Sequence, residues 1–556
     1  MRVLLAIWVL VGCSMLSCKK NDGNNTPLPP PPPAALLLQS ATVNGAVGPN
    51  FINVSRRPVI RFEFSDTVNT ATAAGAISFA SAAGAGIPFG ISWEAGNRIM
   101  NLQPEAGRLA GLEQYTITVS NALRSKNGGA LTDAVQLRII TQIDSTRKFP
   151  VLSDDSLLTL IQKQTFRYFW DFGHPVSGMA RERNTSGDLV TTGGSGFGVM
   201  AMITAVNRGF ITRQQALERI TTMVDFLQHK AQRFKGAYPH WLNGISGVVI
   251  PFSANDNGAD LVETSFLAMG LLSARQFFSQ PAAAETSLRD SINAIVDSIQ
   301  WNWFRRGNED VLYWHWSPDK GWAMNLKIQG WNECLITYVL AASSKHYAIP
   351  QSVYQKGWTR DGAFRNGKTF FGTVLPLGSD MGGPLFLSQY SFLGINPNGL
   401  SDAFANYKTQ QVAHSLINQA YCRQNPQNRW GYSDSCWGLT ASDIPGSYTA
   451  SSPANDVGVI APTAAISAMP FVPQESMKAI RFFYEVLGDK IWKEYGFTDA
   501  FRLSDLWFAS SFLAIDQGPQ IVMIENHRSG LLWQLFTSCP EVRVGMKQLG
   551  FTAPYL

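Results

Sequence analysis

The chain has 556 residues, which is more than one hydrophobic core normally organises, so two or more domains are expected. Hydrophobic residues make up 45% and charged residues 15% of the chain, a balance that excludes a largely disordered protein. The net charge of +5 is not concentrated in any Lys/Arg-rich run, so nucleic acid is not an expected partner.

Residues 1–18 have the pattern of a lipoprotein signal peptide. Arg2 precedes an apolar run, and small residues precede a cysteine at both Cys13 and Cys18. Cys18 is favoured as the lipid anchor because the polar stretch KKNDGNN follows it directly, although Cys13 has the better local match. A single membrane helix is the alternative, but about 16 apolar residues are short for one. The protein is therefore expected in the cell envelope, anchored through lipid to a membrane at the periplasmic face or the outer surface.

Residues 19–34 contain a proline run that is typical of a stiff, extended linker. In residues 35–143 apolar and polar residues alternate, as in Ile60, Phe62 and Phe64, which is typical of half-buried antiparallel strands. This part is predicted to be a small β-sandwich. The segments RPVIRFEFSDTV and YTITVSNALRSKNGGAL resemble bacterial immunoglobulin-like (Ig-like) modules. No carboxylate cluster occurs here, so a spacer or binding role is expected.

Residues 150–556 change to a helical period and predict helices in pairs. About six antiparallel helical hairpins that close on themselves would form an (α/α)6 toroid, with inner helices apolar on all sides. An open helical solenoid is the alternative, but no fixed repeat is visible. The fold class is therefore mainly α, with a small N-terminal Ig-like β-sandwich. The later helix pairs are predicted over residues 260–278 and 285–304, 332–347 and 401–422, 462–469 and 473–487, and 518–527 and 531–549.

The four cysteines beyond the signal peptide have neither CxxC nor Cys/His ligand spacing, so neither a metal site nor a cofactor is expected. Cys422 and Cys436 could form a disulfide in an oxidising compartment, or both could remain free buried thiols.

Acidic residues at the starts of helices and in long loops are candidates for glycoside chemistry, which needs a protonated carboxyl group and a second carboxylate. Asp260 and Glu263 in GADLVET lie one helical turn apart, which suits either a helix capping box or a catalytic site. Asp443 and Asp456 lie in Gly/Pro-rich loops with no obvious helix to cap, which favours catalysis over an Asx-turn role.

Glu182 and Asp188 precede a glycine-rich turn that lacks the features of a phosphate-binding loop, so they are also candidate acids. Aromatic and polar residues in the same loops are candidates for substrate binding, because a flat ring face matches the apolar face of a sugar. Packing in the core, helix capping or a structural hydrogen bond is the alternative role for each. These candidates are His240, Trp241, Asp260, Trp314, His315, Trp322, Trp331, Asn332, Glu333, Tyr390 and Trp437.

Segments spread over about residues 150–550 resemble the bacterial glucoamylase-like domain, a group that contains the endo-β-1,2-glucanases of glycoside hydrolase family 144. The resemblance rests on SGFGVMAMITAVNRGFITRQQA, GADLVETSFLAMGLL, GWNECLITYVLAASS, GPLFLSQYSFLGINP, WGLTASD, DVGVIAPTAAISAMPF and DQGPQIVMIENHRSGLLW. It implies an (α/α)6 barrel that hydrolyses β-1,2-glucan to sophorooligosaccharides with inversion and without a metal.

The resemblance also implies roles for particular acids. Glu263 matches a position that is important for activity, and either Asp443 or Asp456 matches the second required carboxylate. Glu182 or Asp188 matches acids before the SGFG turn. This sequence has DVGVIAP where relatives often have DGTIAP, which leaves the alignment of Asp456 less secure.

The predicted function is a glycoside hydrolase that cleaves β-1,2-glucan to sophorose or sophorooligosaccharides, acting as a monomer. Glu263 is expected to protonate the glycosidic oxygen, and Asp443 or Asp456 to help deprotonate water. A lyase, epimerase or transglycosylase on the same fold is one alternative, and a glycan-binding lipoprotein without catalysis is another. The sequence leaves open whether cleavage is endo or exo.

Overall fold

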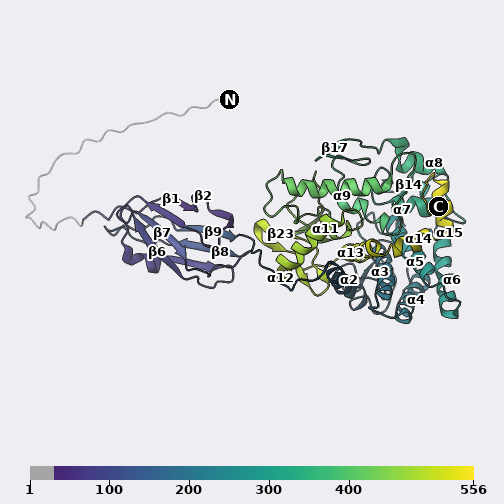
Figure 1. Ribbon diagram of the computed structural model, residues 1–556, viewed down its shortest axis with the longest axis horizontal. Helices are drawn as coiled ribbons and strands as arrows, with labels where there is room; N and C mark the ends of the chain where they lie inside the picture. Colours follow the sequence, from purple (N-terminus) through teal and green to yellow (C-terminus); the bar gives the residue numbers. More distant parts are fainter. Residues whose placement is uncertain (1–29) are drawn as a thin grey trace, which may run out of the picture. The chain divides into compact units, whose positions relative to one another are not determined.

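The computed structural model describes residues 30–556 (Figure 1). The predicted signal peptide, Cys18 and most of the linker lie outside the described residues. No helix within residues 30–556 combines the length and apolar character needed to cross a membrane. The chain divides into two compact units: residues 57–106 and 116–138 belong to the first, and residues 139–556 belong to the second.

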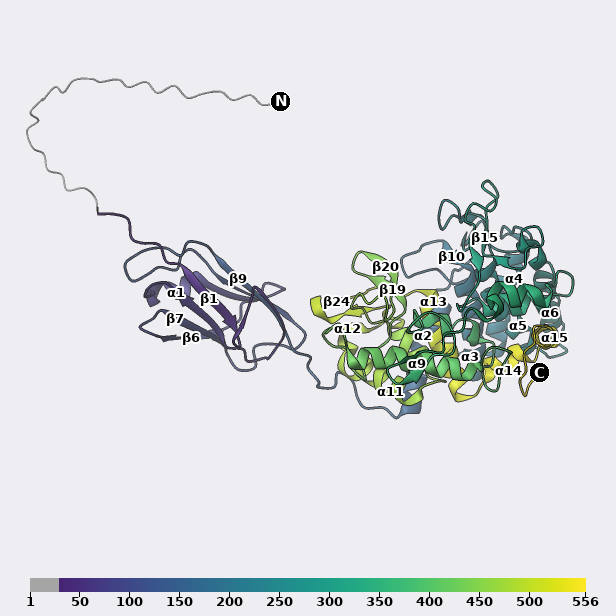
Figure 2. The same ribbon diagram turned by 90° about the horizontal axis from the view of Figure 1, so that it is seen from above.

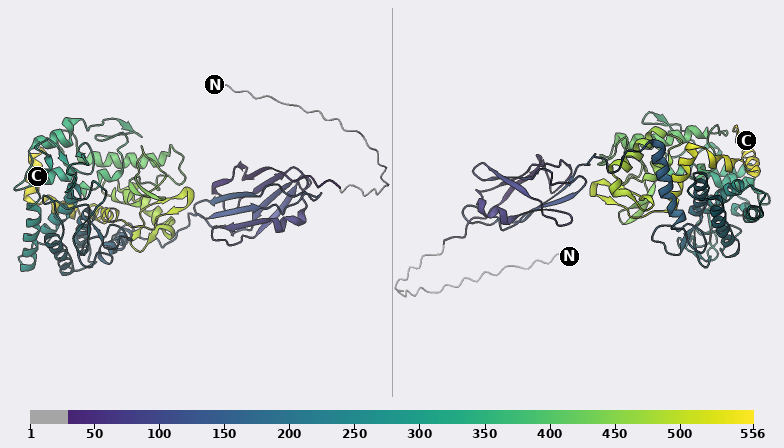
Figure 3. Two further views of the ribbon diagram at one scale, coloured as in Figure 1. Left: turned by 180° about the vertical axis from the view of Figure 1, so that it is seen from behind. Right: turned by 60° about the horizontal axis from the view of Figure 1, so that its bottom comes forward.

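The N-terminal strands form two sheets, as the alternating pattern predicts (Figure 3). Ile60 lies opposite Leu102 and Phe62 opposite Met100, and all four side chains are buried. Because side chains alternate across a strand, these apolar residues share one face and form a core. One sheet has the order β2 (Ala46–Val47), β1 (Leu38–Val43), β4 (Ile60–Phe64), β7 (Ile99–Pro104) and β6 (Phe89–Glu94), and the other has the order β3 (Asn50–Val54), β9 (Val135–Thr141), β8 (Gln114–Val119) and β5 (Ile77–Ser81), with helix α1 (Ala73–Ala76) before β5.

The second unit is built from helices (Figure 2). Some are buried on nearly every side, namely α3 (Thr192–Asn207), α5 (Leu261–Phe277), α7 (Leu335–Ser343), α10 (Pro462–Ser467) and α13 (Ala514–Arg528). The others are α2 (Asp154–Trp170), α4 (Arg213–His229), α6 (Ala283–Asp297), α8 (Gln351–Val353), α9 (Tyr407–Gln424), α11 (Pro473–Arg481), α12 (Gly488–Ile491), α14 (Leu531–Thr537) and α15 (Pro540–Gln548). Helices α4 and α6 bury one face each, which is typical of helices on the outside of a domain.

Helix α3 packs against both α5 and α13. Glycines make the first contact close: a Cβ atom at Gly270 would lie 2.2 Å from the carbonyl oxygen of Gly196, and a Cβ atom at Gly196 would lie 2.2 Å from that of Phe266. The two backbones therefore touch, which fixes the N-terminus of α5 beside that of α3.

Short strand pairings stabilise the long loops, for which no strands were predicted. They are β10 (Leu189–Thr191), β11 (Trp241–Asn243) and β12 (Val249–Ile250) in one sheet, and the pairs β13 (Ala259–Asp260) with β15 (His315–Trp316), β14 (Leu312–Tyr313) with β16 (Lys327–Ile328), β17 (Thr369–Phe370) with β18 (Thr373–Val374), β19 (Ala441–Ile444) with β20 (Ser447–Ala450), β21 (Trp492–Lys493) with β22 (Gly496–Phe497), and β23 (Phe501–Arg502) with β24 (Trp507–Phe508).

Several predicted helix boundaries were wrong. The predicted helix 531–549 is two helices, because Pro540 begins the second one and cannot donate a backbone hydrogen bond within the first. The predicted helix 332–347 begins only at Leu335. Cys422 and Cys436 are both free and buried, so they are not joined by a disulfide.

Candidate active site

Asp260 caps the N-terminus of α5, which was one of its two predicted roles. Its Oδ1 accepts hydrogen bonds from the backbone N–H groups of Val262 and Glu263 at 3.0 and 2.9 Å. The indole N–H of Trp314 donates to the same oxygen at 2.9 Å. The capping box is incomplete, because the carboxylate of Glu263 turns to α3 and does not return to the cap. Glu263 is therefore available for chemistry.

Glu263 is a buried carboxyl group with 7% of its surface exposed. Its Oε2 accepts a hydrogen bond of 2.7 Å from the backbone N–H of Gly193, the second residue of α3. A Cβ atom at position 193 would lie 2.5 Å from that oxygen, so only glycine allows this approach. Burial raises the pKa of Glu263, and the negative charge of Asp260 adds to the effect. This environment favours the protonated form that a general acid needs.

Two histidines and two aspartates form a compact charged cluster beside Glu263. His240 Nδ1 lies 3.2 Å from Asp260 Oδ2, and His315 Nε2 lies 3.3 Å from Asp256 Oδ2 and 3.5 Å from Asp260 Oδ2. Burial opposes the charged imidazoles, but the neighbouring carboxylates outweigh it and raise the pKa of His240 to about 9 and that of His315 to about 10. Both histidines therefore carry a positive charge at neutral pH and balance the two aspartates.

The ligand atoms of His240, Asp256 and Asp260 lie within 4.8 Å of one another, so this group could hold a metal ion. A metal would need the free electron pairs of the imidazole nitrogens. Because the pKa values of both imidazoles are raised, a metal ion would have to displace the proton of His240 to bind here.

A second group of acids is organised by Arg183. Its guanidinium contacts Glu182 Oε2 at 2.9 Å and both carboxylate oxygens of Asp443 at 3.2 Å. The hydroxyl of Ser511 donates to Asp443 Oδ2 at 2.5 Å. One arginine therefore fixes two carboxylates that are 261 positions apart in the sequence.

Behind Asp443 lies a pair of buried carboxyl groups, Asp499 and Asp516, whose charges influence each other. The backbone N–H of Asp443 donates to Asp499 Oδ2 at 2.7 Å. Burial raises the pKa of Asp499 to about 7, and burial together with the charge of Asp499 raises the pKa of Asp516 well above its usual value. Two such carboxyl groups can share a proton, as like charges so close cannot both ionise.

Glu263 and, from the second group, Glu182 line one cavity of about 480 Å³. One side of the cavity is lined by Glu263, His240, Trp241 and Phe252. The cavity lining also includes Glu182, Arg183 and Tyr448, with Tyr390 from the segment before α9. The ring of Phe252 stacks on His240 with centroids 4.3 Å apart, and 49% of Phe252 is exposed. The cavity, which we name the central cavity, combines acids with aromatic walls, as expected for a site that binds and cleaves a sugar.

Of the predicted site residues, five line the central cavity: Glu182, His240, Trp241, Glu263 and Tyr390. Asp260, Trp314 and His315 lie behind His240 in the charged cluster described above. Asp443 contacts Arg183 and does not itself line the central cavity. Glu333 is half-buried; burial and the charges of Asp260 and Glu263 raise its pKa to about 7.

The other predicted residues lie elsewhere. The indole of Trp437 is fully buried, and Trp331 is 7% exposed and packs on Trp358, so the structure places both in the core and not on a rim. Trp322 stacks on Trp303, with centroids 4.8 Å apart. Asn332 Oδ1 accepts from the backbone N–H of Cys334 and the indole N–H of Trp358, which is a structural role.

Asp456 and Asp188 are also outside the central cavity. Asp456 is 3% exposed, accepts hydrogen bonds from the hydroxyls of Tyr421 and Tyr432, and pairs with Arg429. Asp188 lies 3.2 Å from His174 Nε2. The bonds of Asp456 are thus directed at α9 and at its own loop, which favours Asp443 as the second carboxylate.

Sequence analysis missed several residues of the site: Arg183, Phe252, Asp256, Tyr448, Asp499 and Asp516. Arg183 and Asp256 stood within one or four residues of predicted acids, so the same loops could have suggested them. No local sequence pattern marks Tyr448 or Asp499, because only the fold brings them to the candidate active site. Asp516 lies in DQGPQ, a segment that carried the family resemblance but no assigned residue.

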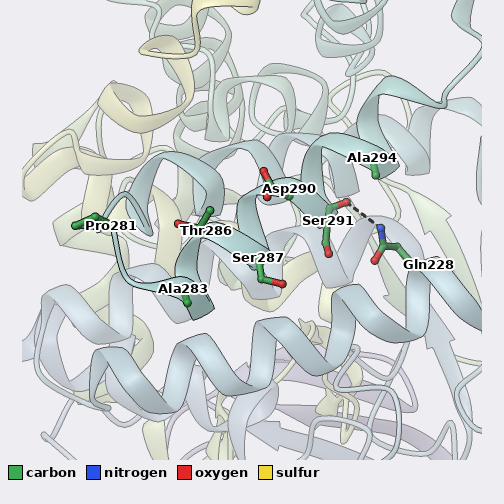
Figure 4. Close-up of a pocket in the computed structure, with 8 residues that line it drawn as sticks. All are labelled: Gln228, Pro281, Ala283, Thr286, Ser287, Asp290, Ser291 and Ala294. Atoms are coloured by element: carbon green, nitrogen blue, oxygen red, sulfur yellow. Dashed lines mark hydrogen bonds between the residues drawn. The ribbon is translucent and has the colours of Figure 1, made fainter.

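A shallower hollow of about 690 Å³ lies between α4 and α6 (Figure 4). Its lining includes Gln228, which donates to the carbonyl oxygen of Ser291 at 3.3 Å, and a single acid, Asp290. One acid among small and polar side chains gives no acid–base pair, so this hollow offers no comparable chemistry.

Comparisons with known proteins agree with this arrangement. Residues 325–540 match the family model described as "Putative glucoamylase", and residues 38–141 match the model of the bacterial Ig-like domain. A curated exo β-1,2-glucooligosaccharide sophorohydrolase (non-reducing end) from Parabacteroides distasonis is 41% identical over 477 residues. That alignment covers 82% of this chain and 64% of the relative, so the chain spans less than two thirds of its length.

Two solved structures match the helical unit. A protein from Bacteroides uniformis with the same glucoamylase description is 54% identical, with a TM-score of 0.72 over 73% of this chain and 100% of that one. An endo-β-1,2-glucanase from Chitinophaga pinensis, solved with sophorotriose and glucose, is 48% identical, with a TM-score of 0.71 over 73% of this chain and 100% of that one.

Proposed function

Since the chain belongs to the glucoamylase-like family of the endo-β-1,2-glucanases of glycoside hydrolase family 144, with an N-terminal bacterial Ig-like domain, we propose that it is a glycoside hydrolase acting on β-1,2-glucan. Its products would be sophorose or sophorooligosaccharides. The observation that carries the proposal is the central cavity, which Glu263 lines together with Glu182 and with Arg183, the residue that also holds Asp443. The substrates named for the matched relatives support the linkage.

In the proposed mechanism Glu263 is the general acid. Burial keeps its proton in place, and it would donate that proton to the glycosidic oxygen directly or through a substrate hydroxyl. Asp443, held by Arg183 and Ser511, would help deprotonate the attacking water. Cleavage with inversion needs room for that water, so the two carboxyl groups should act across about 6.5–9.5 Å. Glu182 would orient Arg183.

We also propose that the helices close into an (α/α)6 toroid around the central cavity. The first and the last of the buried helices, α3 and α13, pack against each other, which supports closure. A closed ring would explain how loops from distant parts of the chain meet at one site.

Lipid anchoring through Cys18 in the cell envelope is a proposal that rests on sequence alone. Labelling cells with a fatty-acid analogue should mark the wild type and C13A but not C18A. If C18A is labelled and C13A is not, Cys13 is the anchor. Action as a monomer is a further proposal, which sedimentation analysis of the protein without its signal peptide can check.

The proposed function is tested by separating the products formed from β-1,2-glucan, β-1,3-glucan and maltooligosaccharides. We expect sophorose or sophorooligosaccharides from the first substrate only. Products from maltooligosaccharides alone would contradict the linkage, and products with an unsaturated sugar ring would indicate a lyase.

A further inference from the structure

A second hollow, of about 500 Å³, adjoins the central cavity. Arg183 and Tyr448 line both hollows, so the two meet at these side chains. Asp443 and Ser511 line the second hollow and not the central cavity. The proposed acid and the proposed base therefore belong to different hollows, with Arg183 between them.

The floor of the second hollow includes Trp507 and Phe508 of β24. Strand β24 pairs with β23 in a tight hairpin whose turn is closed by an ion pair of 2.6 Å between Arg502 and Asp505. Leu506, directly before Trp507, has a φ of 56°, a left-handed conformation that costs a non-glycine residue about 1–2 kcal/mol. The surrounding structure thus holds these two aromatic residues in a defined place.

Trp507 is available for a ligand. It is partly exposed and packs on a small apolar cluster of Val459, Ala461 and Ala500. Phe508 stacks on Phe501, whereas Trp507 stacks on no other ring among residues 30–556. An indole that rests on a firm base and has no ring partner can stack on the apolar face of a sugar.

Polar groups suited to sugar hydroxyls surround this indole. The side-chain hydroxyls of Thr185 and Ser510 make no hydrogen bond to the described part of the protein, and both residues are exposed and line the second hollow. Asn184, which holds them in place, is itself fixed: its amide donates to the carbonyl oxygen of Ser510 at 3.0 Å and accepts from the N–H of Phe512 at 3.1 Å. A flat aromatic group with hydroxyls around it is typical of a carbohydrate site.

We infer that the second hollow binds glucosyl units of the glucan beyond the bond that is cleaved, with Trp507 as their stacking platform. The inference rests on the proposed function. The glucan would pass from the central cavity over Arg183 and Tyr448 into the second hollow, so glucosyl units would bind on both sides of the cleaved bond. A long glucan would therefore gain contacts in the second hollow that a short oligosaccharide cannot reach.

The test compares wild type, W507A, the conservative variant W507F and the control W303A. Trp303 lies in a hollow that shares no residue with the two described above. For each protein kcat/KM is measured on long β-1,2-glucan and on a short sophorooligosaccharide, from the reducing ends that form. Thermal melting checks that each variant is folded.

W507A should lose about tenfold in kcat/KM on the long glucan, mainly through KM, with little change on the short substrate. W507F should retain most of the activity, and W303A should behave as the wild type.

Equal losses on both substrates, or an unaffected W507A, would overturn this inference alone. A wild type that forms no product from β-1,2-glucan would contradict the proposed function as well.

Discussion

The carboxyl group of Glu263 is under two opposing influences. A helix N-terminus stabilises negative charge in its first turn, which by itself lowers a carboxyl pKa. Burial acts in the other direction and dominates, so the pKa is raised, while cationic His240 limits the rise. His240 Nε2 lies 3.9 Å from Glu263 Oε1, close enough to influence its proton directly.

This geometry predicts a shift in the pH profile. The rate should fall as pH rises and Glu263 loses its proton. In H240Q the positive charge that favours the carboxylate is gone, so Glu263 should hold its proton to higher pH. The alkaline limb of kcat/KM on β-1,2-glucan should therefore move upward in H240Q. A limb that moves downward, or stays in place, would contradict Glu263 as the titrating acid.

Substitution of Asp443 should affect catalysis, whereas substitution of Asp456 should affect stability. D443N should lower kcat by about 100-fold or more with little change in melting temperature, since a base is lost and the fold is not. D456A removes the buried partner of Arg429, Tyr421 and Tyr432 and should cost about 3 kcal/mol in free energy of unfolding, with kcat per folded molecule retained. Denaturant unfolding and kinetics on both variants check this. A large loss of kcat in D456A, with kcat retained in D443N, would instead make Asp456 the base.

The contact between α3 and α5 depends on glycine. Gly196→Ala or Gly270→Ala forces a methyl group against backbone atoms at 2.2 Å, so each should destabilise the protein by about 1–3 kcal/mol. The control is Gly75→Ala in α1, where the added methyl group meets nothing within 4 Å. Because Gly193 in α3 donates to Glu263, a shift of α3 should also reduce kcat. If the unfolding free energies equal that of Gly75→Ala, α3 and α5 can move apart without a loss of stability.

The pairing of β13 with β15 brings His315 to the aspartates at the start of α5. The pKa of His315 is raised to about 10 in the folded protein from about 6.5 when unfolded. Its stabilising contribution is therefore complete below about pH 6.5 and disappears as pH rises toward 10. The difference in unfolding free energy between wild type and H315Q should shrink over this range. A difference that is constant with pH would contradict a charged His315.

Much of the element pattern could be predicted from the sequence, because long helices repeat their apolar face many times. The range of α5 was predicted to within one residue at each end. The two-residue strands could not be predicted, since two residues carry no period and their pairing depends on distant partners. The same limit applies to the site: Glu263 has a local motif, but Tyr448 reaches the central cavity only through the β19–β20 hairpin.

Across the whole molecule, the central cavity draws residues from Glu182 to Ile515, a span of the helical unit from its first buried helix to its last. The proposed ring of helices would account for this convergence, because all loops at one end of a ring face its axis. None of residues 30–141, which contain the N-terminal strands, lines the central cavity. Catalysis is thus assigned to the helical unit alone.

The most direct test of this account is the rate at which purified β-1,2-glucan is hydrolysed by wild type and by Glu263→Gln, which keeps the shape and the hydrogen bond to Gly193 but cannot donate a proton as an acid. The account predicts sophorose or sophorooligosaccharides from the wild type and a kcat lowered by about 100-fold or more in the variant, with melting temperature preserved. Equal rates in the two proteins, or a wild type that leaves the glucan intact, would contradict it.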